Sequence, residues 1–227
     1  NKIFQIYPIN IKKTKMNDDI KIIFMSSIKL ETNEKEFLFW KTHKEKILSN
    51  FAILDDKYFW QNNLANKNLF EINRFYRITK SLLRFEIVTY LKKIYDKKFV
   101  LIGEDWRKYS IDSLKSNYDT KKNKKIYKGN ICLDTGSLEG SSSLYPRANQ
   151  IIESGGLIVQ SYAFDASEHW KDLKQDLLFK NFDELRNIID KLINNLELSN
   201  ILLGKIYKHF KNSNISMEET LNRYFSK

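Results

Sequence analysis

The sequence is poor in cysteine and histidine: its 227 residues include one cysteine, Cys132, and three histidines. A single thiol cannot form an internal disulfide, and no histidine lies at zinc-site spacing from it. No run approaches the roughly 18 consecutive apolar residues that a membrane-spanning helix needs, and the N-terminal part shows no secretory signal pattern. We therefore expect no structural metal, no transmembrane segment and a cytoplasmic location.

Arginine is also scarce, although the chain is strongly basic. The net charge is +11, yet only seven of the 39 basic residues are arginines. Arginine is the side chain favoured for bidentate contacts to phosphates and bases, and the lysines here are spread along the whole chain. We interpret most of this charge as solvated helix faces and expect no nucleic-acid partner.

Short apolar runs alternate with amphipathic stretches. The apolar runs predict buried strands at 20–25, 99–102, 131–133 and 157–159. Apolar residues spaced three and four apart predict helices at 33–50 and at about 72–95. A weak helix or irregular connection is expected around 109–118, and the chain should close with helices at 198–211 and 216–226. The core face of the first helix is predicted to be Phe37, Trp40, Ile47 and Leu48.

Two further helices carry recognisable start signals. Pro146 suits the first turn of a short helix, which Gly155 and Gly156 should end. Asn181 is a predicted N-cap, with Glu184 as its capping-box partner.

Alternating strands and helices predict an α/β domain in which a parallel, Rossmann-like sheet is sandwiched between helices. Residues 1–19 look like a linker, and residues 20–227 are expected to form one Rossmann-like domain with C-terminal helices. In such a fold, ligands bind at the carboxyl ends of the strands.

The strongest anion-binding candidate is the Gly/Ser-rich loop of residues 136–146 and the helix start that follows it. Its backbone amides and the helix dipole favour negative charge, and Arg147 could clamp a diphosphate. A mobile surface turn with a solvated Arg147 is the open alternative. The candidate binding residues that we name here are Gly103, Gly140, Ser143, Tyr145 and Arg147.

Familiar catalytic and nucleotide motifs are missing. The sequence contains no GxGxxG after the first strand, no GxxxxGK[ST] and no GxSxG. His169 could assist a substrate or could be a packed histidine, and Trp106 could stack on a ring or belong to the core. The carboxylates expected near the same face cannot be assigned as an acid/base pair: Glu139, Glu153, Asp165 and Glu168.

One segment resembles a known family. Residues 147–156, RANQIIESGG, followed by LIVQ, resemble the R-x-F-E-x-x-A-x-G-G block and strand of glycosyltransferases of group 1 and of the spore-maturation type. Over residues 20–200, the segments IKIIFMSS and KFVLIGEDW are similar to family strands. LLFKNFDELRNIIDKLINN is similar to a family strand, turn and amphipathic helix.

The resemblance implies the C-terminal, donor-binding half of a two-domain GT-B glycosyltransferase. The donor would be a nucleotide-diphospho-sugar such as a UDP-sugar, with no metal or other cofactor required. The acceptor is unknown, and an acceptor-binding N-terminal domain would be missing. By this resemblance Arg147 faces the diphosphate, while Gly155 and Gly156 permit tight helix-to-strand packing. The catalytic residues stay unassigned.

Gln150 departs from the family pattern, which has a ribose-binding glutamate at that place. An amide carries no charge and accepts fewer hydrogen bonds than a carboxylate. The alternative function is therefore a degenerate, non-catalytic transferase domain that binds a glycan or a protein.

Overall fold

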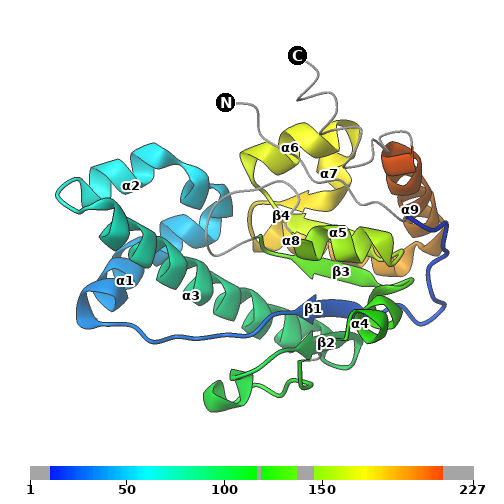
Figure 1. The fold of residues 1–227 in the computed structure, drawn as a ribbon, viewed down its shortest axis with the longest axis horizontal. Coiled ribbons are helices and arrows are strands. Elements are labelled where there is room, and N and C mark those ends of the chain that lie inside the picture. Colours follow the sequence, from blue (N-terminus) through cyan, green and yellow to red (C-terminus); the bar gives the residue numbers. More distant parts are fainter. Residues whose placement is uncertain (1–10, 117–118, 137–145, 212–227) are drawn as a thin grey trace, which may run out of the picture.

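A computed structural model describes residues 11–116, 119–136 and 146–211. Within them, five parallel strands form one sheet in the order β2-β1-β3-β4-β5 (Figure 1). The register places Ile22 of β1 opposite Phe99 of β2 and Ile131 of β3. The strands are β1 (Ile22–Met25), β2 (Phe99–Ile102), β3 (Ile131–Asp134), β4 (Leu157–Ser161) and β5 (Leu178–Phe179).

Helices connect and cover these strands. The α-helices are α1 (Glu34–Ser49), α2 (Lys57–Leu64), α3 (Leu69–Tyr95), α4 (Thr120–Tyr127), α5 (Pro146–Glu153), α6 (Phe164–Trp170), α7 (Lys174–Leu177), α8 (Phe182–Asn194) and α9 (Leu196–Lys211). Short 3-10 helices occupy Phe51–Asp55, Asp96–Lys98, Trp106–Tyr109 and Lys171–Leu173.

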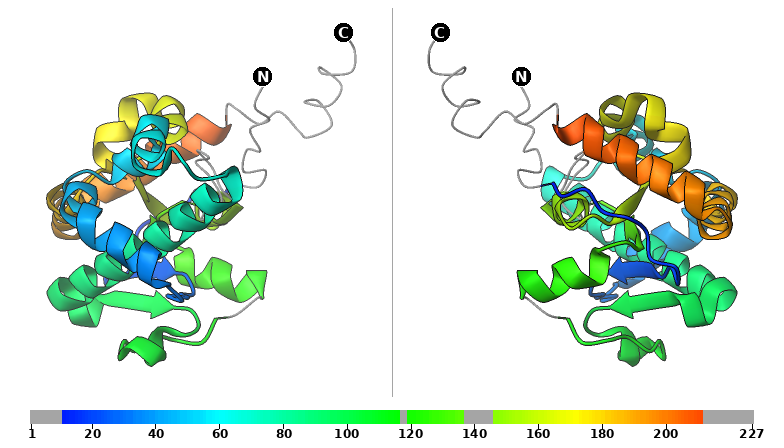
Figure 2. Two further views of the ribbon diagram at one scale, coloured as in Figure 1. Left: turned by 90° about the vertical axis from the view of Figure 1, so that its left-hand side faces the viewer. Right: turned by 90° about the vertical axis from the view of Figure 1, so that its right-hand side faces the viewer.

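The sheet is covered by helices on both faces. On one face α3 and α8 lie side by side, because Tyr90 stacks on Phe182 and the Tyr95 hydroxyl donates to Asp190 Oδ1 at 2.7 Å. On the other face α4 contacts α5, and α9 packs against β4 (Figure 2). The strands are apolar runs buried from both sides, as parallel strands must be. The fold is therefore the expected α/β, Rossmann-like domain.

The connection from β1 to β2 carries a helical lobe made of α1, α2 and the first half of α3, at the left of Figure 1. Aromatic rings fill its interior: Phe39 stacks on Trp60 with centroids 5.7 Å apart and meets Phe75 edge-on. Asn68 caps α3 through a capping box with Glu71, so the helix begins at Leu69 rather than near residue 72.

Several local expectations need correction. Phe37 is 55% exposed, and Phe39 takes its place on the buried face of α1 because that face follows residues 36, 39, 40 and 47. Of the two alternatives for 109–118, the irregular connection describes residues 111–116, which lie between the 3-10 helix at 106–109 and α4. Helices α2, α6 and α7 were not expected, and β5 was implied only by the family resemblance. The helix expected at 216–226 lies outside the described residues.

The cap of α8 is confirmed with a difference. Asn181 Oδ1 accepts from the Glu184 amide at 2.9 Å, but Glu184 Oε2 reaches back to the amide of Lys180 at 2.7 Å. The cap therefore extends one residue beyond an ordinary capping box.

Residues 11–19 have no regular secondary structure, yet they lie against the domain. The Met16 amide donates to Asn200 Oδ1 at 2.9 Å, and the Asn17 amide donates to the Gly129 carbonyl at 2.9 Å. Met16 is itself buried. This part of the expected linker segment is attached to α9 and to the start of β3.

Candidate functional site

The strand order places a topological switch point between β1 and β3. From β1 the chain moves outward to β2, and β3, β4 and β5 then extend the sheet in the other direction. In open α/β sheets, ligands bind outside the carboxyl ends of the two central strands at such a point. Here those ends are Met25 of β1 and Asp134 of β3.

Asp134 is a fully buried carboxylate at this point. Its Oδ1 accepts from the Gly136 amide at 3.2 Å, and its Oδ2 accepts from Gln160 Nε2 at 3.2 Å. Gln160 Oε1 in turn accepts from Trp170 Nε1 at 3.0 Å. Burial raises the pKa of Asp134, while the positive charge of Arg147 is the largest influence that lowers it. The carboxylate therefore joins the ends of β3 and β4.

Two further cations reach this edge from α3. Arg84 Nε donates to Thr135 Oγ1 at 3.3 Å, and its Nη2 donates to the Gly136 carbonyl at 3.5 Å. Lys80, one turn earlier, lies 3.7 Å from Asp55 Oδ1. Burial lowers the pKa of Lys80, and Asp55 acts in the opposite direction. Arg84 is thus held by the loop after β3, and Lys80 is held by Asp55 of the helical lobe.

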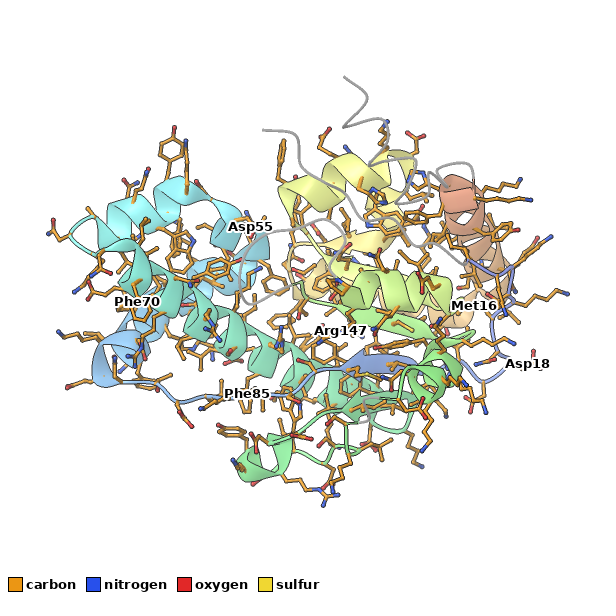
Figure 3. The ribbon with its side chains drawn as sticks, in the orientation of Figure 1. Met16, Asp18, Asp55, Phe70, Phe85 and Arg147 are labelled. Atoms are coloured by element: carbon orange, nitrogen blue, oxygen red, sulfur yellow. The ribbon has the colours of Figure 1, made fainter. Side chains whose placement is uncertain are left out.

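Arg147 stands in the first turn of α5, where Pro146 occupies the first helical position. Its side chain is half-buried, and Figure 3 shows it at the centre of the domain beside the sheet. Its charge also opposes the rise in the pKa of Tyr127 that burial causes. Among the described residues, no carboxylate lies within ion-pair distance of its guanidinium. Arg147 is therefore a candidate contact for an anionic ligand.

The structure brings some of the predicted residues to this edge. Gly103 follows β2, and a Cβ there would lie 2.0 Å from the Ser26 carbonyl oxygen, so the close approach of the two loops requires glycine. Gln150 lies half-buried on α5, one turn after Arg147. Gly140, Ser143 and Tyr145 lie outside the described residues.

Gly155 and Gly156 lie elsewhere, at the amino end of β4. Gly155 has φ +75°, and a Cβ there would lie 2.0 Å from Thr14 Oγ1. A Cβ on Gly156 would lie 2.8 Å from Cys132 Sγ. Both glycines allow α5 to turn tightly into β4, and neither reaches the carboxyl edge of the sheet.

Two ambiguous residues belong to the core. Trp106 is fully buried, and its indole Nε1 donates to the Ser26 carbonyl at 2.5 Å. His169 is buried against Trp170 and Phe210, with its ring centroid 5.1 Å from that of His209. Of the four candidate carboxylates, Glu153 lies 3.7 Å from Lys124 on the surface of α4 and α5.

Sequence reasoning missed Lys80, Arg84, Asp134 and Gln160. Two signals were present. Asp134 directly follows an apolar run, and Arg84 lies among apolar residues on the buried face of a predicted helix, where an unpaired charge would be costly. A charged residue on a predicted core face therefore indicates a polar site.

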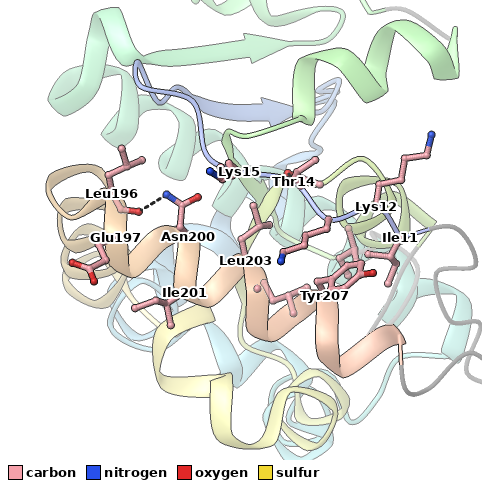
Figure 4. Close-up of a pocket in the computed structure, with 15 residues that line it drawn as sticks. Ile11, Lys12, Thr14, Lys15, Leu196, Glu197, Asn200, Ile201, Leu203 and Tyr207 are labelled. Carbon is pink, nitrogen blue, oxygen red and sulfur yellow. Dashed lines mark hydrogen bonds between the residues drawn. The ribbon is translucent and has the colours of Figure 1, made fainter.

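A cavity of about 710 Å³ lies near the amino end of β4, away from the carboxyl edge of the sheet. It is formed by residues 11–15, the end of α5 and one face of α9 (Figure 4). Asn200 and Leu203 project into it from α9, and Lys12 and Lys15 stand at its rim. The cavity shares no residue with the carboxyl edge of the sheet.

Among the described residues, no group of three or more His, Cys, Asp or Glu side chains could hold a metal ion. Within the same part of the chain, no helix is both long and apolar enough to cross a membrane. Comparison of the chain with protein-family models, curated proteins and solved structures finds no match in any of the three. The fold and the site define a Rossmann-like α/β domain with a cationic switch point.

Proposed function

We propose that this chain is the donor-binding half of a glycosyltransferase and that its ligand is a nucleotide-diphospho-sugar. The observation that carries the proposal is the set of three cations, Lys80, Arg84 and Arg147, around the carboxyl end of β3. A diphosphate carries several negative charges, which a group of cations and a helix start can together balance.

The chemistry expected of these residues is electrostatic. When the bond between the anomeric carbon and the diphosphate breaks, negative charge develops on the leaving oxygens. Arg147 and the amides of the first turn of α5 would stabilise that charge. The buried Asp134 holds the Gly136 amide and links the end of β3 to Gln160 of β4. We expect the proton acceptor to come from an acceptor-side domain.

The proposed setting is cytoplasmic. Cys132 is a free, buried thiol, which is the usual state of cysteine in a reducing compartment. The proposed partners are the nucleotide-sugar donor, an acceptor and an N-terminal acceptor-binding domain.

Calorimetric titration of the whole chain with UDP, GDP, ADP, CDP and TDP tests this proposal, without added metal and at two salt concentrations. We expect one nucleotide to bind saturably and Arg147→Ala to weaken it by about 1–3 kcal/mol, because a charge-assisted contact is lost. Arg186→Ala on α8 is the matched control, since that arginine lies on the surface and pairs with Asp190. If the Arg147→Ala variant and the unmodified chain bind the nucleotide equally well, Arg147 does not contact the diphosphate.

A second candidate function is supported by Gln150. The family has a ribose-binding carboxylate at this position, and here an amide replaces it. The second candidate is therefore a non-catalytic domain that no longer binds the donor and instead binds a glycan or a protein. Failure of every nucleotide to bind would favour this degenerate module over the transferase half.

A further inference from the structure

The cavity beside α9 is a groove with a buried apolar floor. Its volume of about 710 Å³ is usual for a small-molecule site, and we call it the α9 groove. The residues of its floor are at most 5% exposed: Ile152, Leu203 and Ile206. Leu196 and Ile201 at its rim are 38% and 47% exposed. A ligand must enter the groove to reach the floor, because a flat surface touches only the rim.

The groove is elongated along the helix. Residues of α9 line it from Leu196 to Tyr207, a rise of about 16 Å. The segment that forms its other wall runs beside the helix, with Lys15 toward the Leu196 end and Ile11 toward the Tyr207 end (Figure 4). This shape suits one extended chain better than a compact ring.

Two polar side chains inside the groove already have partners in the protein. The Thr14 hydroxyl donates to the Gly155 carbonyl at 3.3 Å. Asn200 uses both ends of its amide, because its Oδ1 accepts from the Met16 amide at 2.9 Å and its Nδ2 donates to the Leu196 carbonyl at 3.0 Å. A ligand beside these groups therefore gains from apolar contact rather than from new hydrogen bonds.

The charged residues of the groove favour an anion. Lys12, Lys13 and Lys15 are exposed, and none of them has an ion-pair partner among the residues that the structure describes. Glu197, in the first turn of α9, is the acidic residue of the lining. The three lysines all belong to the segment opposite α9. A carboxylate on that side of the groove is attracted by several ammonium groups at once.

We propose that the α9 groove is a second ligand site of this chain and that it binds a free fatty acid in its anionic form. The hydrocarbon chain lies along α9 against Leu203 and Ile206, and the carboxylate lies among the three lysines of residues 12–15. The groove shares no residue with the carboxyl edge of the sheet, so it is separate from the proposed donor site. Its ligand does not depend on whether the chain is a transferase.

An NMR titration of the ¹⁵N-labelled whole chain with octanoate, decanoate and dodecanoate tests this proposal, at concentrations below those that form micelles. We expect saturable shifts of the amides of residues 11–15 and 196–207. Each methylene that becomes buried should tighten binding about fourfold, as its transfer from water predicts. Acetate and dodecyltrimethylammonium should both bind more weakly than dodecanoate, because the first lacks the chain and the second reverses the charge.

A lysine variant and its control locate the carboxylate. The variant combines three substitutions on the segment opposite α9: Lys12→Gln, Lys13→Gln and Lys15→Gln. The control removes three exposed lysines of α4 instead: Lys121→Gln, Lys122→Gln and Lys125→Gln. Both lower the net charge equally. We expect the variant to bind dodecanoate about tenfold more weakly, the usual effect of losing a charged contact, and the control to bind it as the unmodified chain does.

A second variant locates the hydrocarbon chain. Gly204 lines the groove, and nothing lies within 4 Å of its Cβ position. Gly204→Leu should therefore fill part of the groove and weaken dodecanoate more than octanoate. Leucine is a better helix former than glycine, so α9 should remain intact, which a thermal unfolding midpoint no lower than that of the unmodified chain would show.

The outcomes separate the groove from the donor site. Shifts confined to other residues, equal binding of dodecyltrimethylammonium, affinity independent of chain length, or unchanged binding by the lysine variant would each overturn the assignment. Binding to vesicles of anionic phospholipid without binding of free dodecanoate would assign the lysines to a membrane surface instead. None of these results bears on the shifts that UDP causes at residues 134–136 and 146–150, so the donor proposal is tested separately.

Discussion

Gln160 Nε2 donates a hydrogen bond of 3.2 Å to Asp134 Oδ2 across the neighbouring strands β4 and β3. The amide can point only one way, because its Oε1 accepts from Trp170 Nε1. The second carboxylate oxygen accepts from the Gly136 amide. Both oxygens of Asp134 are thus acceptors, and a side chain with one oxygen and one NH₂ group cannot satisfy both donors.

Asp134→Asn should therefore lower the free energy of unfolding by about 1–3 kcal/mol, since one buried donor loses its partner. Urea denaturation monitored by tryptophan fluorescence measures the loss. Asp176→Asn is the matched control, because its ion pair with Lys191 at 2.8 Å lies on the surface and should be worth less than about 1 kcal/mol. Equal stability of the Asp134→Asn variant and the unmodified chain would mean that the buried network rearranges without cost.

The fold was predictable from the sequence because its main signals are local. Four compact apolar runs gave four of the five strands, and Pro146 and Asn181 marked helix starts that the structure confirms. Strand β5 has only two residues and lies beside α7, so it carries too little pattern to be recognised without the family resemblance. The helical lobe was missed in part because its short helix α2 is fixed by aromatic contacts of Trp60 with Phe39 of α1 and Tyr76 of α3.

The site was less predictable, because the sheet brings together residues from distant parts of the chain. Arg147 could be identified from its helix start, but Arg84 precedes it by 63 positions. Its place on the apolar face of α3 marks it as unusual, yet its partners are known only once α3 is placed beside the loop after β3. Asp134 follows the apolar run of residues 131–133 and was not identified. Its role follows from the pairing of β3 with β4, which no local pattern encodes.

Gly103→Ala should destabilise the protein by more than about 2 kcal/mol. The new Cβ would lie 2.0 Å from the Ser26 carbonyl oxygen, and backbone atoms cannot move aside cheaply. Gly204→Ala provides the matched control, because nothing lies within 4 Å of its Cβ position in α9. That change should stabilise the helix by up to about 1 kcal/mol. Thermal unfolding of the two variants should therefore shift in opposite directions, and a shared direction would contradict the close approach at Gly103.

Acid should weaken the contact between α6 and α9. Burial, aided by His209 and Lys171, lowers the pKa of His169 to about 4, from an ordinary value of 6.5. The unfolded chain thus binds a proton at a higher pH than the folded chain. This contribution to stability is fully present above pH 6.5 and is lost as the pH falls toward 4, by at most about 3 kcal/mol.

Unfolding midpoints in urea at several pH values between 7 and 4.5 measure this loss. His169→Phe keeps a ring against Phe210, which is 5.2 Å away and stacked, but removes the titrating group. The variant should show a shallower decline in stability with acid. An identical decline in both proteins would assign the effect to other groups.

Gln150→Glu tests the register of the family resemblance. If residue 150 faces the ribose of the donor, a carboxylate there accepts hydrogen bonds from both hydroxyls, and nucleotide affinity should rise by about 1 kcal/mol, or roughly fivefold. Gln175→Glu on α7 makes the same chemical change at an exposed position and should not alter nucleotide affinity. Calorimetry with the nucleotide that the unmodified chain binds compares the two. Weaker or unchanged binding by the Gln150→Glu variant would show that residue 150 does not face the ribose, and that the chain departs from the family at this position by more than one side chain.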